Sequence, residues 1–169
     1  AASVHKNNVK RVIRALEIYH LTGKPKSLID REAPEENPAL SVCNLFLDFC
    51  DRALLYARID ARVEAMAEAG LFAETERLLR EGKLVEGTTA AAAIGYKELL
   101  PYLRGECDLE SAVAELKTAT RRYAKRQQTW FSAKPYVQWI TANEGKTVRK
   151  SEEIVNKSLM LIQNRWSML

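Results

Sequence analysis

The chain has 169 residues and a formal net charge of +4, and 47% of its residues are hydrophobic while 28% are charged. This length and composition are typical of one folded domain, or of one domain and part of another, and argue against intrinsic disorder. The sequence contains no apolar run of membrane-span length, no signal-peptide pattern, and no disulfide or metal motif among its three cysteines and two histidines, so a reducing, cytoplasmic environment without a membrane partner is expected.

The first predicted element is a helix in "NNVKRVIRALEIYHLTGK", with Asn7 or Asn8 as its expected cap and Gly23 at its expected end. Its apolar residues recur with helical spacing, and its basic residues Lys10, Arg11 and Arg14 lie close to one another. The prolines and acids that follow predict an exposed acidic loop over residues 27–41.

A nearly continuous apolar run, Leu40–Phe49, predicts a buried strand of a parallel sheet. Asp51 is the expected cap of the next helix, which carries an apolar stripe and ends at Gly70. Arg58 and Arg62 lie one turn apart on the flank of that stripe.

The remaining elements are mostly helical. Helices are expected in "LFAETERLLREG" and around Pro101, and the pattern predicts a long helix capped by Asp108 that runs to Phe131. The alternating segment "YVQWIT" predicts a strand, and an amphipathic helix is expected from about Ser151 to Trp166.

The long helix concentrates basic side chains with no acid alternating among them, which favours an anionic partner such as a phosphate backbone. The simplest alternative is a solvated helix face. Trp130 and Phe131 follow the basic residues and are expected in the core, although stacking on an unpaired base is a second interpretation. The basic residues form two neighbouring rows, Lys117, Arg121 and Lys125 in the first and Arg122 and Arg126 in the second.

Two segments that suggest a phosphate loop lack its required residues. In "NEGKT" the glycine that should stand five residues before Gly145 is Ile140, and in "TGKP" the serine or threonine is replaced by Pro25. Both segments are therefore interpreted as turns. The residues by themselves indicate a helical, cytosolic chain that binds anions.

Four segments resemble one enzyme family. They are "HKNNVKRVIRALEIYHLTGKP", "DRALLYARIDARV", "AIGYKELLPYLRGE" and "ATRRYAKRQQTWF", and they are similar to segments of tRNA dimethylallyltransferase, also called tRNA isopentenyltransferase. They occur in the order of that family, and the resemblance covers nearly the whole chain.

The resemblance implies an α/β fold, namely a P-loop-like three-layer core with a helical insertion. This chain would be a mostly helical C-terminal fragment with about two short strands. Residues 1–26 would be the end of the insertion that contacts tRNA, residues 27–41 the acidic loop, and residues 42–169 the C-terminal part of the α/β core. The family's Gly-rich phosphate loop and catalytic Asp are not found in the sequence, so no catalytic residue is expected here and the fragment alone is expected to be inactive.

The resemblance also implies a reaction, the transfer of a dimethylallyl group from dimethylallyl diphosphate to the exocyclic amine of the adenosine 3′ of the anticodon. The implied partners are the tRNA anticodon stem-loop and dimethylallyl diphosphate, with Mg²⁺ held mainly by the family's N-terminal part and no metal ligand in this chain. Arg58 or Arg62, or both, would bind the diphosphate. The implied tRNA-binding residues are Lys10, Arg11, Arg14, Gly95, Tyr96, Lys97, Arg121, Arg122, Lys125 and Arg126.

Two alternatives stay open from the sequence. The first is a non-catalytic helical RNA-binding module, and the second is a helical interaction domain that binds tRNA no better than any polyanion. A Gly-rich loop ending in GK[ST] in an upstream reading frame would favour the enzyme. The oligomeric state is not predicted.

Overall fold

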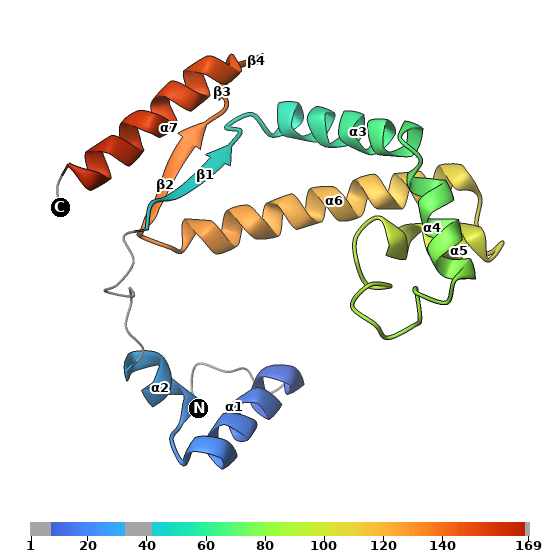
Figure 1. The fold of residues 1–169 in the computed structure, drawn as a ribbon, viewed down its shortest axis with the longest axis horizontal. Coiled ribbons are helices and arrows are strands. Elements are labelled where there is room, and N and C mark those ends of the chain that lie inside the picture. Colours follow the sequence, from blue (N-terminus) through green and yellow to red (C-terminus); the bar gives the residue numbers. More distant parts are fainter. Residues whose placement is uncertain (1–7, 33–41, 168–169) are drawn as a thin grey trace. The chain divides into compact units, whose positions relative to one another are not determined.

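The computed structural model describes residues 8–32 and 42–167, and the chain divides into two compact units, Ala1–Val42 and Cys43–Leu169 (Figure 1). In the first unit α1 spans Val9–Thr22. The Asn8 side chain caps it by accepting a hydrogen bond from the Arg11 amide at 3.3 Å, and Gly23 ends it with a φ of 69°, in the left-handed region that favours glycine. The predicted helix and its end at Gly23 are confirmed.

A second helix, α2, spans Lys26–Glu32, so the expected loop is wrong for this segment. The acids that suggested a loop instead form ion pairs with nearby lysines. Lys26 pairs with Asp30 one helical turn away, and Lys24 pairs with Glu32 at 2.7 Å. The remainder of the expected loop, residues 33–41, lies outside the described residues.

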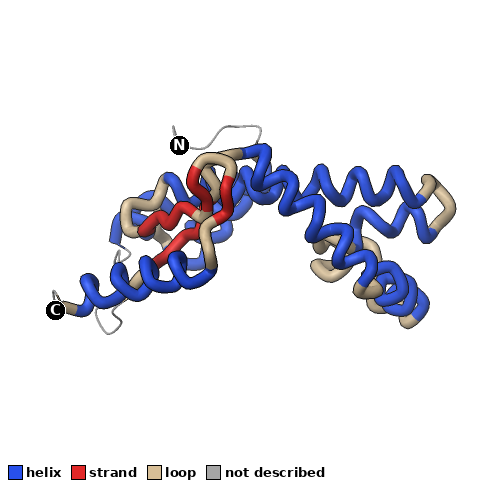
Figure 2. Tube along the Cα trace, turned by 90° about the horizontal axis from the view of Figure 1, so that it is seen from above, coloured by secondary structure: helices blue, strands red, loops and turns tan. Residues whose placement is uncertain are grey.

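The second unit contains a short parallel sheet formed by β1, Asn44–Asp48, and β2, Val137–Thr141. In this register Asn44 lies opposite Val137 and Asp48 lies opposite Thr141. Both predicted strands are confirmed in type, and β1 occupies the centre of the predicted apolar run. The strands lie beside the C-terminal helix α7, Ser151–Trp166, which packs against β2 (Figures 1 and 2).

The segment "NEGKT" forms a turn, as interpreted from the sequence. It joins β3, Asn143–Glu144, to β4, Thr147–Val148, in an antiparallel hairpin. Gly145 adopts a φ of 54° at this turn.

Two long helices, α3 (Arg52–Glu68) and α6 (Leu109–Ser132), run side by side away from the sheet (Figure 1). At the far end they meet the shorter helices α4, Leu71–Arg80, and α5, Tyr96–Leu103. This four-helix arrangement buries the larger of two apolar clusters, whose buried members are Val63, Leu71, Leu99, Ala112 and Leu116.

Aspartate caps fix where both long helices begin. The Asp51 carboxylate accepts hydrogen bonds from the amides of Ala53 at 2.8 Å and Leu54 at 3.1 Å. The Asp108 carboxylate accepts one from the Ser111 amide at 2.7 Å, and this bond lowers the pKa of Asp108 below its usual value. Both predicted caps are confirmed.

Candidate functional site

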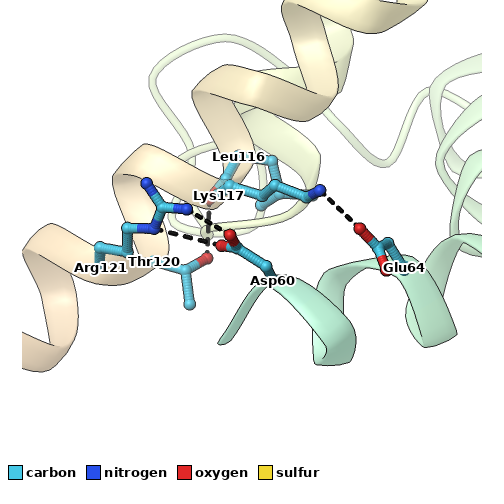
Figure 3. A network of polar contacts seen from close by, with 6 residues as sticks. All are labelled: Asp60, Glu64, Leu116, Lys117, Thr120 and Arg121. Atoms are coloured by element: carbon cyan, nitrogen blue, oxygen red, sulfur yellow. Dashed lines mark hydrogen bonds and ion pairs between the residues drawn. The ribbon is translucent and has the colours of Figure 1, made fainter. Parts of the chain in front are cut away.

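The facing sides of α3 and α6 are joined by ion pairs (Figure 3). The Lys117 ammonium lies 2.7 Å from a Glu64 carboxylate oxygen. The Arg121 guanidinium forms a two-pronged pair with Asp60, in which Nε donates to Oδ1 at 3.1 Å and Nη2 donates to Oδ2. The Arg121 guanidinium also lies 5.2 Å from the centre of the Tyr56 ring.

These pairs correct the expectation that the charge on the basic helix is uncompensated. The compensating acids come from α3, more than fifty residues earlier in the chain. On α6 itself, Arg122 pairs with Glu115 at 3.4 Å. Because Lys117 and Arg121 already bind carboxylates, they are poorer candidates for phosphate contacts than the sequence implied.

The end of α6 nearest the sheet keeps its positive charge. Lys125 and Arg126 form no ion pair with any residue in the described ranges, and the Arg126 guanidinium lies over the Tyr123 ring at 5.6 Å. Lys134 follows the helix, and its ammonium lies 5.0 Å from the centre of the Trp130 ring. Together with Arg122, Thr129 and Ala133, the residues Lys125, Arg126, Trp130 and Lys134 line a surface groove of about 680 Å³.

The two aromatic residues at this end have different environments. Phe131 packs on Phe46 of β1, with ring centres 4.7 Å apart, and so anchors α6 to the sheet. Trp130 meets the edge of Phe131 at an interplanar angle of 89°, yet its side chain is 56% exposed. The expectation that both lie in the core is therefore confirmed for Phe131 and wrong for Trp130.

A smaller and more enclosed cavity, of about 230 Å³, lies where β1 ends and α3 begins. Its lining combines cationic, acidic and aromatic side chains from β1, α3 and α6. Gln128 donates a hydrogen bond from Nε2 to Asp48 Oδ1 at 2.5 Å across this site. The residues that line the cavity are Asp48, Phe49, Cys50, Arg52, Leu55, Tyr56, Lys125 and Gln128.

The structure separates the two arginines that the sequence left equivalent. The Arg58 guanidinium lies 5.3 Å from the centre of the Phe49 ring, and Phe49 is part of the cavity wall. Arg62 is exposed on α3, one turn farther along, and does not line the cavity. Arg58 is therefore the one of the two that lies beside the cavity.

The turn that carries Cys50 is held by hydrogen bonds to Asn143, a residue that was not a candidate from the sequence. Asn143 is 1% exposed, and its Oδ1 accepts a hydrogen bond from the Cys50 amide at 2.9 Å. Its Nδ2 donates to the Gly145 carbonyl at 2.6 Å and also contacts Cys50 Sγ at 3.2 Å. Asn143 therefore fixes the backbone between β1 and the start of α3.

The segment Gly95–Lys97 begins α5, at the end of α6 away from the sheet. Gly95 has a φ of 111°, a backbone conformation that residues with a side chain rarely adopt. A Cβ added at this position would lie 3.9 Å from Leu71 Cδ1, which is an ordinary van der Waals distance, so the backbone conformation and not the space is what requires glycine. Its amide donates to Glu98 Oε2 at 2.9 Å. The Tyr96 hydroxyl donates to Glu74 Oε1 at 2.6 Å, which raises the pKa of Tyr96, and Lys97 is exposed.

The basic residues of α1 form a third candidate surface. Lys10 and Arg11 are exposed, and Arg14 pairs with Glu17 at 3.1 Å on the same helix. The predicted apolar stripe of α1 is present, but its side chains are exposed. Ile13, Leu16 and Leu21 of this helix line a surface groove.

The predicted residues thus fall into separate places. Lys125 lines the cavity, Arg58 contacts Phe49 of its wall, and Lys125 and Arg126 share the groove, whereas Gly95, Tyr96 and Lys97 lie at the other end of α6. Arg52, Asp48 and Gln128 were missed, although the position of Asp48 and Arg52 on either side of a strand-to-helix turn was a signal that could have selected them.

Residues 8–32 and 42–167 contain neither a cluster of metal ligands nor a helix that could span a membrane. No cluster of three or more His, Cys, Asp or Glu side chains is close enough to hold a metal ion, and no helix there combines the length and apolar composition of a membrane span.

Comparison with known proteins identifies relatives along most of the chain. The IPP transferase family model matches residues 1–134. The chain is 42% identical over 164 residues to a tRNA dimethylallyltransferase of Bacillus cereus, with 97% of this chain and 50% of the relative covered. It is 48% identical over 144 residues to a tRNA dimethylallyltransferase of Acetivibrio thermocellus, with 85% of this chain and 45% of the relative covered.

Solved structures agree with these relatives. A full-length tRNA isopentenylpyrophosphate transferase of Bacillus halodurans matches 99% of this chain and 50% of its own with 35% identity and a TM-score of 0.63. A eukaryotic dimethylallyltransferase described as acting on tRNA matches 96% of this chain and 43% of its own, with 31% identity and a TM-score of 0.70. The expected fold, a mostly helical part of this architecture with few short strands, is confirmed.

The chain spans about half the length of the curated relatives that it matches. The family model covers most of its residues, and the relatives extend over nearly all of it. The chain belongs to the IPP transferase family.

Proposed function

We propose that this chain forms part of a tRNA dimethylallyltransferase and supplies surfaces that bind the anticodon stem-loop and the diphosphate of dimethylallyl diphosphate. The observation that carries the proposal is the 42% identity over 97% of the chain to a protein named tRNA dimethylallyltransferase. The sites of α1, α5 and α6 supply exposed cationic side chains that suit an RNA backbone. The three free cysteines are consistent with a cytoplasmic protein.

In the proposed reaction the amine nitrogen of the adenosine attacks the allylic carbon of the donor. The new N–C bond forms as the C–O bond to the diphosphate breaks, and the diphosphate leaves with the bonding electron pair. The alkylated amine then loses one proton. Charge accumulates on the diphosphate as it leaves, so a guanidinium beside it stabilises the transition state more than the ground state.

Arg58 is the proposed diphosphate ligand of the two candidates. Both arginines are exposed, and Arg58 is the one that contacts Phe49 of the cavity wall. A planar guanidinium can donate two parallel hydrogen bonds to phosphate oxygens. Arg62 stays the second candidate.

The proposed tRNA surface consists of residues from three elements. Lys10, Arg11 and Arg14 lie on α1, Gly95, Tyr96 and Lys97 begin α5, and Arg122, Lys125 and Arg126 lie on α6. Arg121 belongs to the set by family resemblance, but its pairing with Asp60 favours a structural role.

Mg²⁺ would neutralise the diphosphate in an enzyme of this kind. The described residues offer no cluster of metal ligands, so no step is assigned to Mg²⁺ through this chain. Any protein ligands of that ion are proposed to lie outside these residues.

The proposal is tested by a chimera in which this chain replaces the matching half of the Bacillus cereus relative. Purified chimera is incubated with dimethylallyl diphosphate, Mg²⁺ and an anticodon stem-loop carrying three consecutive adenosines, and prenylated adenosine is measured by mass spectrometry. Transfer by the chimera is expected, and Arg58→Ala is expected to lower kcat with little change in RNA affinity. A folded chimera that binds the stem-loop yet transfers nothing, while the parent enzyme is active, would contradict the proposal.

The 169-residue chain assayed alone is expected to transfer nothing, because its sequence contains no phosphate loop. Stem-loop binding separates the alternatives. A helical interaction domain predicts equal affinity for the stem-loop and for an unrelated polyanion of the same charge, whereas the enzyme predicts a preference for the stem-loop.

A further inference from the structure

We infer that Asn143 is a positioning residue for the transfer reaction, because it holds the turn that supports Arg58 and begins α3. The inference rests on the proposed function, in which Arg58 binds the diphosphate. Asn143 belongs to β3, in the hairpin that lies beside this turn (Figure 1). This hairpin follows the stretch matched by the IPP transferase family model, residues 1–134, so the family match assigns no role to it.

Every polar atom of the Asn143 side chain has a partner. Oδ1 accepts a hydrogen bond from the Cys50 amide at 2.9 Å. Nδ2 carries two hydrogens, and it donates to the Gly145 carbonyl at 2.6 Å and to Cys50 Sγ at 3.2 Å. The residue is 1% exposed, so water does not compete for these bonds. Aspartate and leucine have nearly the same shape but lack the two donors, so this set of partners requires asparagine.

The hairpin that carries Asn143 is itself fixed to the sheet. Directly after the last pair of β1 and β2, the Ala142 amide donates to the Asp48 carbonyl at 2.7 Å. The Arg149 amide donates to the Ala142 carbonyl at 2.8 Å, and the Arg149 guanidinium pairs with Glu153 of α7 at 3.5 Å. The side chain of Asn143 therefore extends from a backbone that is held by both β1 and α7.

The turn that Asn143 holds has a separate contact at each of three consecutive residues. The Phe49 ring lies 5.3 Å from the Arg58 guanidinium, and the Cys50 amide binds Asn143. The Asp51 carboxylate caps α3 by accepting amide hydrogen bonds at 2.8 and 3.1 Å. Because planar peptide units link these residues, a movement of Cys50 also moves its two neighbours. The bond to Cys50 therefore fixes the ring beside Arg58 and the start of α3 together.

This arrangement predicts an effect on the rate of transfer more than on RNA binding. A guanidinium stabilises a leaving diphosphate only at the correct distance, and a displacement of about 1 Å in a reacting site can lower a rate by about 100-fold. Asn143 influences Arg58 only through the turn. The cations proposed to bind RNA lie on α1, α5 and α6, whereas the hydrogen bonds of the Asn143 side chain go to Cys50 and Gly145.

The kinetic test uses the chimera with the Bacillus cereus relative. Asn143→Ala is expected to lower kcat by about 10- to 100-fold, with KM for the stem-loop nearly unchanged. The matched control is Thr75→Ala in α4, at the other end of the long helices (Figure 1). Thr75 is also buried, at 0% exposed, and its hydroxyl donates to the Leu71 carbonyl at 2.7 Å. Thr75→Ala is expected to lower Tm and to keep the kcat of the parent chimera.

A second measurement does not depend on activity. Hydrogen exchange of the peptide that contains Cys50 is followed by mass spectrometry in the 169-residue chain. Asn143→Ala is expected to speed exchange of the Cys50 amide by about five- to tenfold, because the amide loses its acceptor, and Thr75→Ala is expected to leave it unchanged. Asn143→Asp keeps an oxygen for the Cys50 amide but loses both donors, so it is expected to lower kcat less than Asn143→Ala does.

The inference is overturned if folded Asn143→Ala keeps the kcat of the parent chimera, or if Thr75→Ala loses kcat to the same extent. Unchanged exchange at Cys50 in Asn143→Ala would also overturn it. If circular dichroism shows that Asn143→Ala does not fold, Asn143→Asp takes its place, and an unchanged kcat in that variant overturns the inference. A chimera that is inactive with Asn143 intact contradicts the proposed function, whereas an active chimera that is insensitive to Asn143→Ala contradicts this inference alone.

Discussion

Replacing Arg121 should cost stability and leave RNA binding almost intact, in contrast to what its place in a basic row suggests. Arg121 pairs with Asp60 through both Nε and Nη2, and the two side chains are 34% and 28% exposed. The guanidinium also covers the Tyr56 ring at 5.2 Å. Arg121→Gln removes both contacts between α3 and α6.

The size of the effect follows from this partial exposure. The side chains of this two-pronged ion pair are about one-third exposed. Its contribution to the free energy of unfolding should therefore lie near the top of the range measured for surface ion pairs, at about 1 kcal/mol. The cation–π contact adds about 0.5–1 kcal/mol. The expected loss in the free energy of unfolding is therefore about 1–2 kcal/mol, which lowers Tm by roughly 2–8 °C for a chain of this length.

The assay is a double-mutant cycle of Arg121→Gln and Asp60→Asn, followed by urea unfolding and stem-loop binding at two salt concentrations. A coupling free energy of about 1 kcal/mol is expected between the two sites. The matched control, Arg122→Gln, breaks a pair at 3.4 Å with a 66% exposed side chain and should cost less than about 0.5 kcal/mol. Lys125→Gln should instead reduce the salt dependence of RNA binding by about one counterion. Additive losses in the cycle, or a reduced salt dependence in Arg121→Gln, would refute the structural role of Arg121.

Three further predictions concern helix starts. Asp108→Ala should lower the Tm of the chain, because it removes the side-chain cap of α6. Because hydrogen bonding to Ser111 lowers the pKa of Asp108, the wild type should lose this advantage as the pH falls through that lowered pKa, and an unfolding free-energy difference that persists at low pH would contradict the prediction. The bond to Glu74 raises the pKa of Tyr96, so ultraviolet difference spectra against Tyr96→Phe should show that this phenol ionises at a higher pH than usual, and Glu74→Gln should abolish that shift. The stability from this bond should be present below the pKa of Tyr96 in the unfolded chain and lost as the pH rises through its pKa in the folded chain. Gly95→Ala should cost about 1–3 kcal/mol in urea unfolding because of the φ of 111°, and a neutral result would show that the turn relaxes.

Local signals in the sequence predicted the local structure well. The aspartates at positions 51 and 108 cap helices as expected, Gly23 ends α1, and the final helix has the predicted bounds. Each of these features depends on hydrogen bonds within one helix turn, which residue type and spacing determine directly. The helix α2 was missed because prolines and acids in the same segment favoured a loop, whereas lysine–acid pairs support the helix.

Long-range features could not be predicted from the pattern. The acids that neutralise Lys117 and Arg121 lie on another helix, and their pairing depends on how α3 packs against α6. The exposure of Trp130 depends in the same way on what lies beside α6, since its spacing alone matches a buried stripe. The cavity combines residues from three elements, so its cations could be recognised only after the strand order and the helix packing were known.

The parallel pairing of β1 with β2 also affects the order in which the chain can fold during synthesis. The strands, and the bond between Cys50 and Asn143 that lies beyond them, join segments 93 residues apart, whereas the contacts among α3, α4, α5 and α6 span shorter separations, such as the 61 residues between Asp60 and Arg121. The helices can therefore associate while β2 is still inside the ribosome, and β1 must remain unpaired with it until residues 137–141 have emerged. An apolar strand that waits this long is a target for chaperones that bind extended segments, so expression of this chain should depend on chaperone supply more than its helical content suggests.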